Sequence, residues 1–295
     1  MSPKKDRLDA AGAAGLTAIA ALLSFNQIVI VWVNEGLQPV FFAGLRSCLA
    51  VLFVGAWLWS QGRPPRHTPG TAGAGLAMGL VFAAEFLCLF LALDLTNVSR
   101  AVILFYSMPV WLALMSHFGL AGERLTGRRV LGLVLAFAGT SVAILDRTGV
   151  QGGASSLTGD LLALAAAICW AGTAFLAKGT SMKAVGAEMQ LFWMVAVSGP
   201  VLLLAAPLFG DLIRELRPSH IGWLVFQSSV VVAGGFIGWL YLLSIYPASS
   251  VGSFAFLTPV ITLCFGWLLL GEQIGPGLIV AAALVGLGLI LINRR

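Results

Sequence analysis

The sequence predicts an all-α, polytopic membrane protein with ten transmembrane helices, arranged as two inverted repeats of five helices. Three observations lead to this prediction. First, 59% of the 295 residues are hydrophobic and 10% are charged, whereas about 25% of the residues of a soluble domain are charged. Second, the apolar residues form long runs that short polar segments separate. Third, a motif of proline followed by Gly-Glu occurs once in each half of the chain.

The apolar runs are long enough for ten membrane-spanning helices, each of which needs about 20 apolar residues. Their expected positions are 10–33, 38–60, 70–94, 98–119, 128–145, 157–180, 186–208, 219–246, 249–270 and 274–292. Turn-forming residues mark the connections, as in QGRPPRHTPG after the second span. The polar segment DRTGVQGGASS separates the fifth span from the sixth. We therefore expect a first five-helix repeat at 1–148, a linker at 149–156 and a second, inverted repeat at 157–295.

The basic residues predict the orientation of the chain. With the N-terminus in the cytoplasm, twelve Lys and Arg residues fall on the cytoplasmic side, and four fall on the other side: Arg100, Arg147, Arg214 and Arg217. Cytoplasmic loops are enriched in Lys and Arg, so we expect both termini in the cytoplasm and the protein in a bacterial inner membrane. The basic residues form no stripe and no nucleic-acid-binding motif. The net charge of +5 therefore does not indicate a nucleic-acid partner.

The internal repeat explains why the halves are expected to be inverted. The first half contains SMPV followed by GERL, and the second contains LTPV followed by GEQI. Pro109 and Pro259 are 150 residues apart, and Glu123 and Glu272 are 149 apart. Each half has five spans, an odd number, so the second half enters the membrane in the opposite direction. Inverted repeats are typical of secondary transporters, which bind their substrate between the halves near the middle of the membrane.

These motifs resemble the drug/metabolite transporter superfamily, EamA-like branch, over essentially the whole chain. Within it, the segments AAEFLCLFLAL, FYSMPV and AAAICWAGTAFLAK are similar to the YddG-type amino-acid exporters. That pattern has an aromatic residue before the glutamate of the third span and another before the proline of the fourth, where this chain has Ala84 and Met108. The difference argues against aromatic amino acids as substrates more than against amino-acid transport. The resemblance implies a central cavity walled by spans 1, 3, 4, 6, 8 and 9, with spans 5 and 10 as scaffold.

Two ionisable residues are expected inside the membrane, Arg46 in the second span and Glu85 in the third. Both lie roughly 12–14 Å from the outer end of their spans at 1.5 Å per residue. Charge is costly in lipid, so both are candidates for function. One interpretation is a structural ion pair that joins the two spans. The other is that Glu85 faces the cavity and binds a substrate ammonium group or a proton.

Further side chains are candidates for the substrate site, for gating and for bending. The residues expected to bind substrate are Asn26, Glu85, Tyr106, Met108, Trp170, Gln227 and Trp239. Lys178 is a candidate for coupling or gating, by its match to the family, and snorkelling to the lipid headgroups is the alternative. The expected hinges are Pro109, Pro259, Gly234 and Gly235. For each of these residues, hydrogen bonding between helices or close packing is the structural alternative.

The sequence contains no metal-binding spacing, catalytic motif or nucleotide-binding loop. His220 and the other histidines are expected in loops or at the end of a span. We therefore predict no enzymatic activity, no cofactor and no coupling to ATP hydrolysis. The expected function is a secondary transporter that exports amino acids or related small metabolites by alternating access, working in the lipid bilayer as a monomer. The alternatives are broad drug or metabolite efflux, an intramembrane enzyme and a channel.

Overall fold

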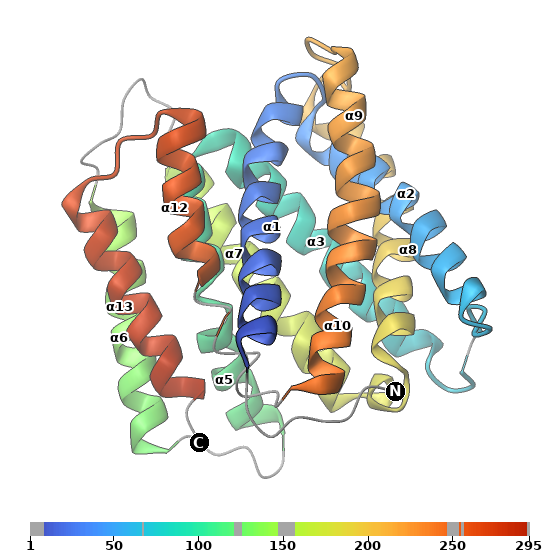
Figure 1. Cartoon of the computed structure of the whole chain (residues 1–295), viewed down its shortest axis with the longest axis horizontal. Helices are drawn as coiled ribbons and strands as arrows, with labels where there is room; N and C mark the ends of the chain where they lie inside the picture. The colour runs from blue at the N-terminus through green and yellow to red at the C-terminus, as the bar shows by residue number, and fades with distance from the viewer. Residues whose placement is uncertain are drawn as a thin grey trace.

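The computed structural model describes residues 9–66, 68–120, 126–146, 157–246, 254 and 257–293. Within these ranges the chain is helical throughout, apart from its turns and one isolated β-bridge (Figure 1). The first half consists of α1 (Ala10–Asn34), α2 (Pro39–Ser60), α3 (Ala72–Leu95), α4 (Val98–Phe105), α5 (Met108–Gly119) and α6 (Gly127–Leu145). The second half consists of α7 (Leu157–Gly179), η1 (Ser181–Ala184), α8 (Ala187–Ala205), η2 (Ala206–Phe209), α9 (Pro218–Phe226), η3 (Gln227–Gly235), α10 (Phe236–Ile245), α12 (Leu257–Leu270) and α13 (Pro276–Asn293).

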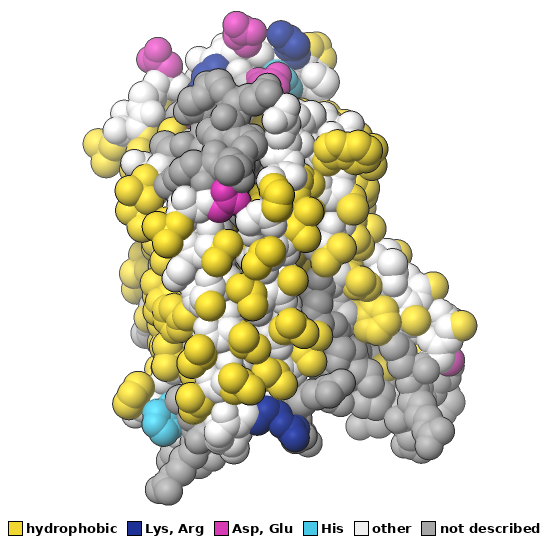
Figure 2. Space-filling view, turned by 90° about the vertical axis from the view of Figure 1, so that its left-hand side faces the viewer, with side chains coloured by type: hydrophobic (Ala, Val, Ile, Leu, Met, Phe, Trp, Pro, Cys, Tyr) yellow, Lys and Arg dark blue, Asp and Glu magenta, His cyan; other side chains and the backbone are white. Residues whose placement is uncertain are grey.

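These elements form the ten predicted spans, because α4 and α5 together make the fourth and α9, η3 and α10 make the eighth. Seven described helical segments are long and apolar enough to cross a membrane, and α12 and α13 are shorter apolar helices. Figure 2 shows hydrophobic side chains over the middle of the side where α6 and α13 lie, with charged side chains at both ends. The chain is therefore an integral membrane protein with several spans.

The two halves run through the membrane in opposite directions. Asn34 and Asp94, at the ends of α1 and α3, both bond to Arg214 and so lie on the same face of the molecule. Asp160, in the first turn of α7, accepts a hydrogen bond from Thr96, directly after α3. The helix α7 therefore begins on the face where α1 ends. We call this the distal face (top of Figure 1) and the opposite one the proximal face.

The fourth span is broken at Tyr106 and Ser107, between α4 and α5. Pro109 lies in the first turn of α5, where the missing amide hydrogen of a proline costs no helical hydrogen bond. Pro259 similarly lies in the first turn of α12. The sequence suggested a proline inside a continuous helix, and the structure instead has Pro109 at a helix start, which its fixed φ angle favours.

The eighth span contains a nine-residue π-helix, η3, between two α-helical segments. Gly234 and Gly235 are its last two residues. A π-helix is rare because each turn is wider than in an α-helix, and such segments occur frequently at functional sites. Ser228 and Ser229, in its first turn, donate hydrogen bonds to the carbonyls four residues earlier.

Glycines allow α6 and α13 to pack backbone against backbone at one edge of the molecule (Figure 1). A Cβ atom built on Gly132 would lie 2.7 Å from the carbonyl oxygen of Gly288, and one on Gly139 would lie 2.8 Å from that of Ala281. Small residues at helix interfaces permit this approach in membranes, where van der Waals packing holds helices together. The pair α6 and α13 thus flanks the elements that carry the polar residues described next.

Candidate functional site

A belt of buried polar side chains lies where the two halves meet. We define the polar belt as Asn26 and Gln27 of α1, Arg46 of α2, Glu85 of α3 and Gln227 at the start of η3. All five are buried. Each lies roughly seven to ten residues along its span from the distal face, a depth of about 10–15 Å at 1.5 Å per residue. The belt thus lies within the membrane-spanning part of the molecule.

Every member of the polar belt has a buried side-chain atom without a hydrogen-bond partner. These atoms are Asn26 Oδ1, Gln27 Oε1, Arg46 Nε, Glu85 Oε2 and Gln227 Oε1. Only two further such atoms occur among the described residues, on Asn34 and Ser116. Leaving a buried polar group unsatisfied costs about 1–3 kcal/mol, and more for a charged one. Their concentration in one belt makes the polar belt the candidate site for a polar ligand.

Hydrogen bonds to backbone carbonyls hold the two halves together at the polar belt. Gln227 Nε2 donates to the carbonyl of Asn26 at 3.2 Å. Ser228 Oγ approaches the carbonyl of Arg46 at 3.3 Å. These bonds use the backbone of α1 and α2 and leave the side-chain oxygens of Asn26 and Gln227 without protein partners. These contacts therefore hold the belt in place and leave its side-chain oxygen acceptors available.

Arg46 and Glu85 attract each other electrostatically, but the described ion pairs include none that joins them within 4.0 Å. The guanidinium carbon of Arg46 lies 4.7 Å from the ring centroid of Phe86 and 5.5 Å from that of Phe90. A cation over an aromatic face gains about 2 kcal/mol when water is excluded. This stacking directs the guanidinium towards the rings, so the close ion pair considered from the sequence is not formed in this structure.

An aromatic wall adjoins the region where the halves meet. We define it as Phe105, Tyr106 and Trp170. Trp170 of α7 stacks on Phe105 of α4 with ring centroids 4.7 Å apart and an angle of 15° between the planes. Tyr106 meets Trp170 edge to face at 5.8 Å, and its hydroxyl lies near the side chain of Thr258 in α12. The wall thus joins helices of both halves.

Three other predicted site residues lie apart from the polar belt or at its margin. Met108 is half-buried against the main core at the start of α5. Trp239 packs with a separate cluster formed by Leu16, Ile245 and Tyr246, about 18 Å along the helix from Gln227 at 1.5 Å per residue. Lys178 is exposed near the end of α7, about 12 Å from Trp170 on the same scale. Neither Trp239 nor Lys178 is therefore brought to the polar belt.

The predicted hinge residues occupy junctions between helical segments. Pro109 follows the break between α4 and α5, and Pro259 is buried at the start of α12. A Cβ atom on Gly235 would be in ordinary contact with Leu22 at 3.5 Å, so packing alone does not require glycine there. The hinge role of these residues stays a prediction.

A buried ion pair that the sequence analysis did not identify joins the halves near the distal face. Arg100 Nη2 lies 2.7 Å from Asp160 Oδ2, and their side chains are 4% and 0% exposed. The prediction placed Arg100 at the outer end of a span, whereas the structure buries it because Asp160 and the backbone carbonyls of Ile144 and Asp146 provide partners. The available signal was that Arg100 and Asp160 both lie within the first turn of a predicted span on the same side of the membrane.

His220 is also buried, although it was predicted in a loop. It lies in the first turn of α9, and its Nδ1 accepts a hydrogen bond from the backbone amide of Arg217 at 3.1 Å. The apolar residues that follow His220 place the start of the helix one residue earlier than expected. Within the described ranges, no group of three or more His, Cys, Asp or Glu side chains is placed to hold a metal ion.

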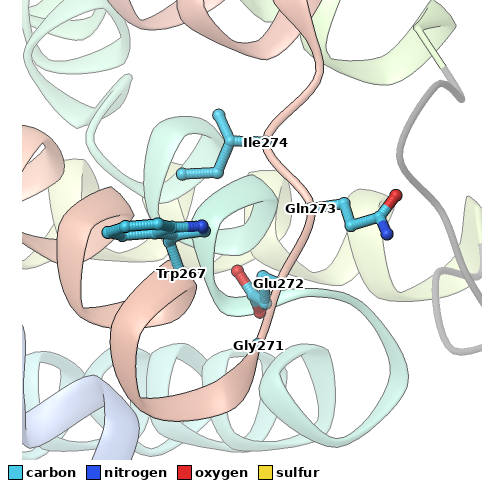
Figure 3. A pocket seen from close by; sticks show the side chains of 5 residues that line it. All are labelled: Trp267, Gly271, Glu272, Gln273 and Ile274. Carbon is cyan, nitrogen blue, oxygen red and sulfur yellow. The ribbon is translucent and has the colours of Figure 1, made fainter.

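The Gly-Glu motif of the second half has a structural role. Glu272 Oε1 accepts from the amide of Val98 at 2.6 Å and Oε2 from that of Ser99 at 3.0 Å, which caps the N-terminus of α4. A surface hollow surrounds it, lined by Trp267, Gly271, Glu272, Gln273 and Ile274 (Figure 3). Because the Glu272 carboxylate is engaged with α4, this hollow offers no charged group to a solute. The corresponding Glu123 and the linker at 149–156 lie outside the described residues.

Comparison with known proteins agrees with the duplicated architecture. Residues 11–145 and 157–294 both match the EamA-like transporter family. The "Uncharacterized transporter YvbV" of Bacillus subtilis is 30% identical over 300 residues, covering 95% of this chain and 92% of that protein. The "Probable amino-acid metabolite efflux pump" of Escherichia coli is 28% identical, covering 92% and 91%. A crystal structure that is 20% identical, with 94% of both chains covered, has the same fold, with a TM-score of 0.64.

Proposed function

Because the chain belongs to the EamA-like transporter family, we propose that it exports amino acids or closely related small metabolites by alternating access, with the polar belt as its binding site. The membership itself makes the chain a membrane transporter and not an enzyme. It also implies a small-molecule substrate. The substrate class, the residues that bind it and the direction of transport are the content of the proposal.

The arrangement of Arg46 and Glu85 is the observation that carries the proposal. A buried cation and a buried anion lie in one belt, and Arg46 Nε and Glu85 Oε2 both lack a partner. An amino acid has a carboxylate that suits a guanidinium and an ammonium group that suits a carboxylate, and such charge-assisted hydrogen bonds are about twice as strong as neutral ones. Asn26 of the first half and Gln227 of the second half add neutral acceptors.

The surroundings of the charged pair favour an apolar substituent on the substrate. The Phe86 ring lies beside Arg46, and the aromatic wall lies on α4 and α7. Small-molecule sites typically combine apolar walls with a few placed polar groups. A strongly anionic solute such as a phosphate ester fits less well, because Arg46 is the only basic member of the belt. The printed name of the Escherichia coli relative, an amino-acid metabolite efflux pump, supports the same substrate class.

We infer the location and orientation of the transporter from the distribution of charge. We place it in the cell membrane of a bacterium as a monomer, with both termini and the proximal face in the cytoplasm. Glu85 then binds the substrate ammonium group, or a proton in its place, while Lys178 lies at the cytoplasmic end of α7 as a candidate gate. Side-specific labelling of Asp211→Cys, on the distal face, tests this orientation.

Counterflow with purified protein in liposomes tests the proposal. We expect saturable exchange of one or more amino acids, and Glu85→Gln is expected to slow it at least tenfold and to flatten its pH dependence. Glu188→Gln, which removes a partly exposed carboxylate at the start of α8, is the matched control and should retain the wild-type rate. Absence of counterflow with every amino acid tested would refute the substrate class. Efficient exchange of amphipathic cations without a carboxylate would favour broad efflux instead.

A further inference from the structure

A second contact between the halves closes the distal face above the polar belt. The segment between η2 and α9 lies on the turn between α1 and α2, where Leu37 and Ile213 form an antiparallel β-bridge. The amide of Arg214 donates to the carbonyl of Gly36 at 3.0 Å, and the amide of Gln38 donates to that of Leu212 at 3.0 Å. Backbone hydrogen bonds therefore join the second half to the first at this face.

Arg214 also binds the C-terminal ends of two helices, α1 and α3. Its Nη1 and Nη2 lie 2.7 and 2.8 Å from the two carboxylate oxygens of Asp94, at the end of α3. Nη1 also donates to the carbonyl of Asn34, the last residue of α1, at 2.8 Å. One guanidinium from the second half thus binds α1 and α3 of the first half, the two helices that carry Asn26 and Glu85 to the polar belt.

His220 adds a steric interlock to the same contact. A Cβ atom on Gly36 would lie 1.8 Å from the Nδ1 atom of His220, so the imidazole fits against the turn only because residue 36 is glycine. The turn between α1 and α2 and the start of α9 therefore meet as complementary surfaces. Any separation of the halves at the distal face must part them.

This contact differs in solvation from the other ion pair that joins the halves at the same face. The side chains of Arg100 and Asp160 are 4% and 0% exposed, whereas those of Arg214 and Asp94 are 39% and 20% exposed. Breaking a buried pair leaves uncompensated charge in a region of low dielectric constant. A partly exposed pair exchanges its partner for water at little cost. The ion pair of Arg100 and Asp160 is therefore suited to remain closed, and the ion pair of Arg214 and Asp94 is suited to open and close.

We propose that the distal latch, formed by Asn34–Gln38, Asp94, the segment 212–214 and His220, is the gate through which solute leaves the polar belt towards the distal face. Arg214 holds the latch closed by binding Asp94 and the carbonyl of Asn34, and the latch is closed in this structure. Opening requires the Arg214 guanidinium to release Asp94 and the bridge between Leu37 and Ile213 to separate. The inference rests on the chain being a transporter that opens to both faces, and it does not depend on which solute is carried.

A disulfide across the β-bridge tests whether the latch must open. Leu37 and Ile213 face each other as a pair flanked by hydrogen bonds, so their Cα atoms are about 4.5 Å apart, within the range that a disulfide spans. The variant Leu37→Cys/Ile213→Cys is made with Cys48, Cys88, Cys169 and Cys264 replaced by serine or alanine. Oxidation is expected to lower counterflow at least tenfold, and reduction to restore it. A fully formed disulfide with unchanged counterflow would overturn the proposal.

A labelling experiment tests the latch without knowledge of the substrate. Asn26→Cys in the same cysteine-free background reports access to the polar belt by a membrane-impermeant maleimide applied at the distal face. Asp94→Asn, which removes the carboxylate that binds Arg214, is expected to raise the labelling rate roughly three- to tenfold, because a partly exposed bidentate ion pair is lost. The matched control is Glu215→Gln, which removes the neighbouring exposed pair with Arg217 and should leave the rate unchanged.

The two experiments separate the latch from the proposed function. Suppose that no amino acid gives counterflow, but that Asp94→Asn still raises the labelling rate and the disulfide between residues 37 and 213 lowers the labelling rate. The substrate class then fails and the latch stands. If Asp94→Asn labels at the rate of the parent and of Glu215→Gln, the latch fails whatever the substrate. Thermal stability of each variant, measured alongside, identifies any change in labelling that comes from unfolding.

Discussion

Arg46 illustrates how a charged side chain is accommodated deep inside this protein without a close carboxylate. Its guanidinium lies over Phe86 and Phe90, and its Nε remains without a partner. The sequence predicted that Arg46 and Glu85 lie inside spans, because apolar residues flank both. It could not predict their separation, because that depends on two rings on a neighbouring helix. Arg100 was misplaced for a similar reason: its burial depends on Asp160, which is 60 residues away in sequence.

The buried pair of Arg100 and Asp160 gives a stability prediction at this scale. Asp160→Asn leaves Arg100 buried with its charge uncompensated, so we expect a loss of about 3–5 kcal/mol in the free energy of unfolding. Glu215→Gln breaks the exposed pair with Arg217 and is expected to cost less than about 1 kcal/mol. Denaturant unfolding of the purified variants in detergent measures both. Equal stability of the two variants would contradict the assignment of Arg100 and Asp160 as a fixed joint between the halves.

At the scale of helices, the positions of the spans followed from the length of the apolar runs, but two interruptions did not. The fourth span breaks at Tyr106 and Ser107, and the eighth contains the π-helix η3. Both interruptions occur where a side chain meets another helix: Tyr106 lies near Thr258, and Gln227 donates to the carbonyl of Asn26. Such contacts between distant segments override local helix propensity, so no local pattern in the sequence indicates them.

Pro109 provides a test of the break between α4 and α5. Because it lies in the first turn of α5, Pro109→Ala removes no hydrogen bond, and we expect the free energy of unfolding to change by less than about 1 kcal/mol. Alanine favours continuation of the helix through Ser107, which would displace Tyr106 from Trp170, so the counterflow rate is expected to fall severalfold. Thermal unfolding and counterflow on the same preparation measure the two effects. An unchanged counterflow rate would exclude Pro109 as a hinge.

At the scale of the whole molecule, inversion of the two repeats brings the ends of α1 and α3 and the start of α7 to one face. It thereby places the polar belt between the halves, with the distal latch above it. The duplicated, ten-span architecture was predictable because the Pro and Gly-Glu motifs recur at nearly constant spacing. The latch was not predictable, because its segment between η2 and α9 carries no repeat or motif. Only the fold brings Arg214 to Asp94.

The central claim is that Arg46 and Glu85 together recognise a zwitterion. Ligand-induced thermal stabilisation of the purified protein tests it most directly, with three ligands that share one side chain: an amino acid, the amine that lacks its carboxylate and the acid that lacks its ammonium group. We predict that only the amino acid stabilises the wild-type protein, because each analogue leaves one buried charge unmatched. Equal stabilisation by the amine or the acid, at the same concentration, would contradict the claim.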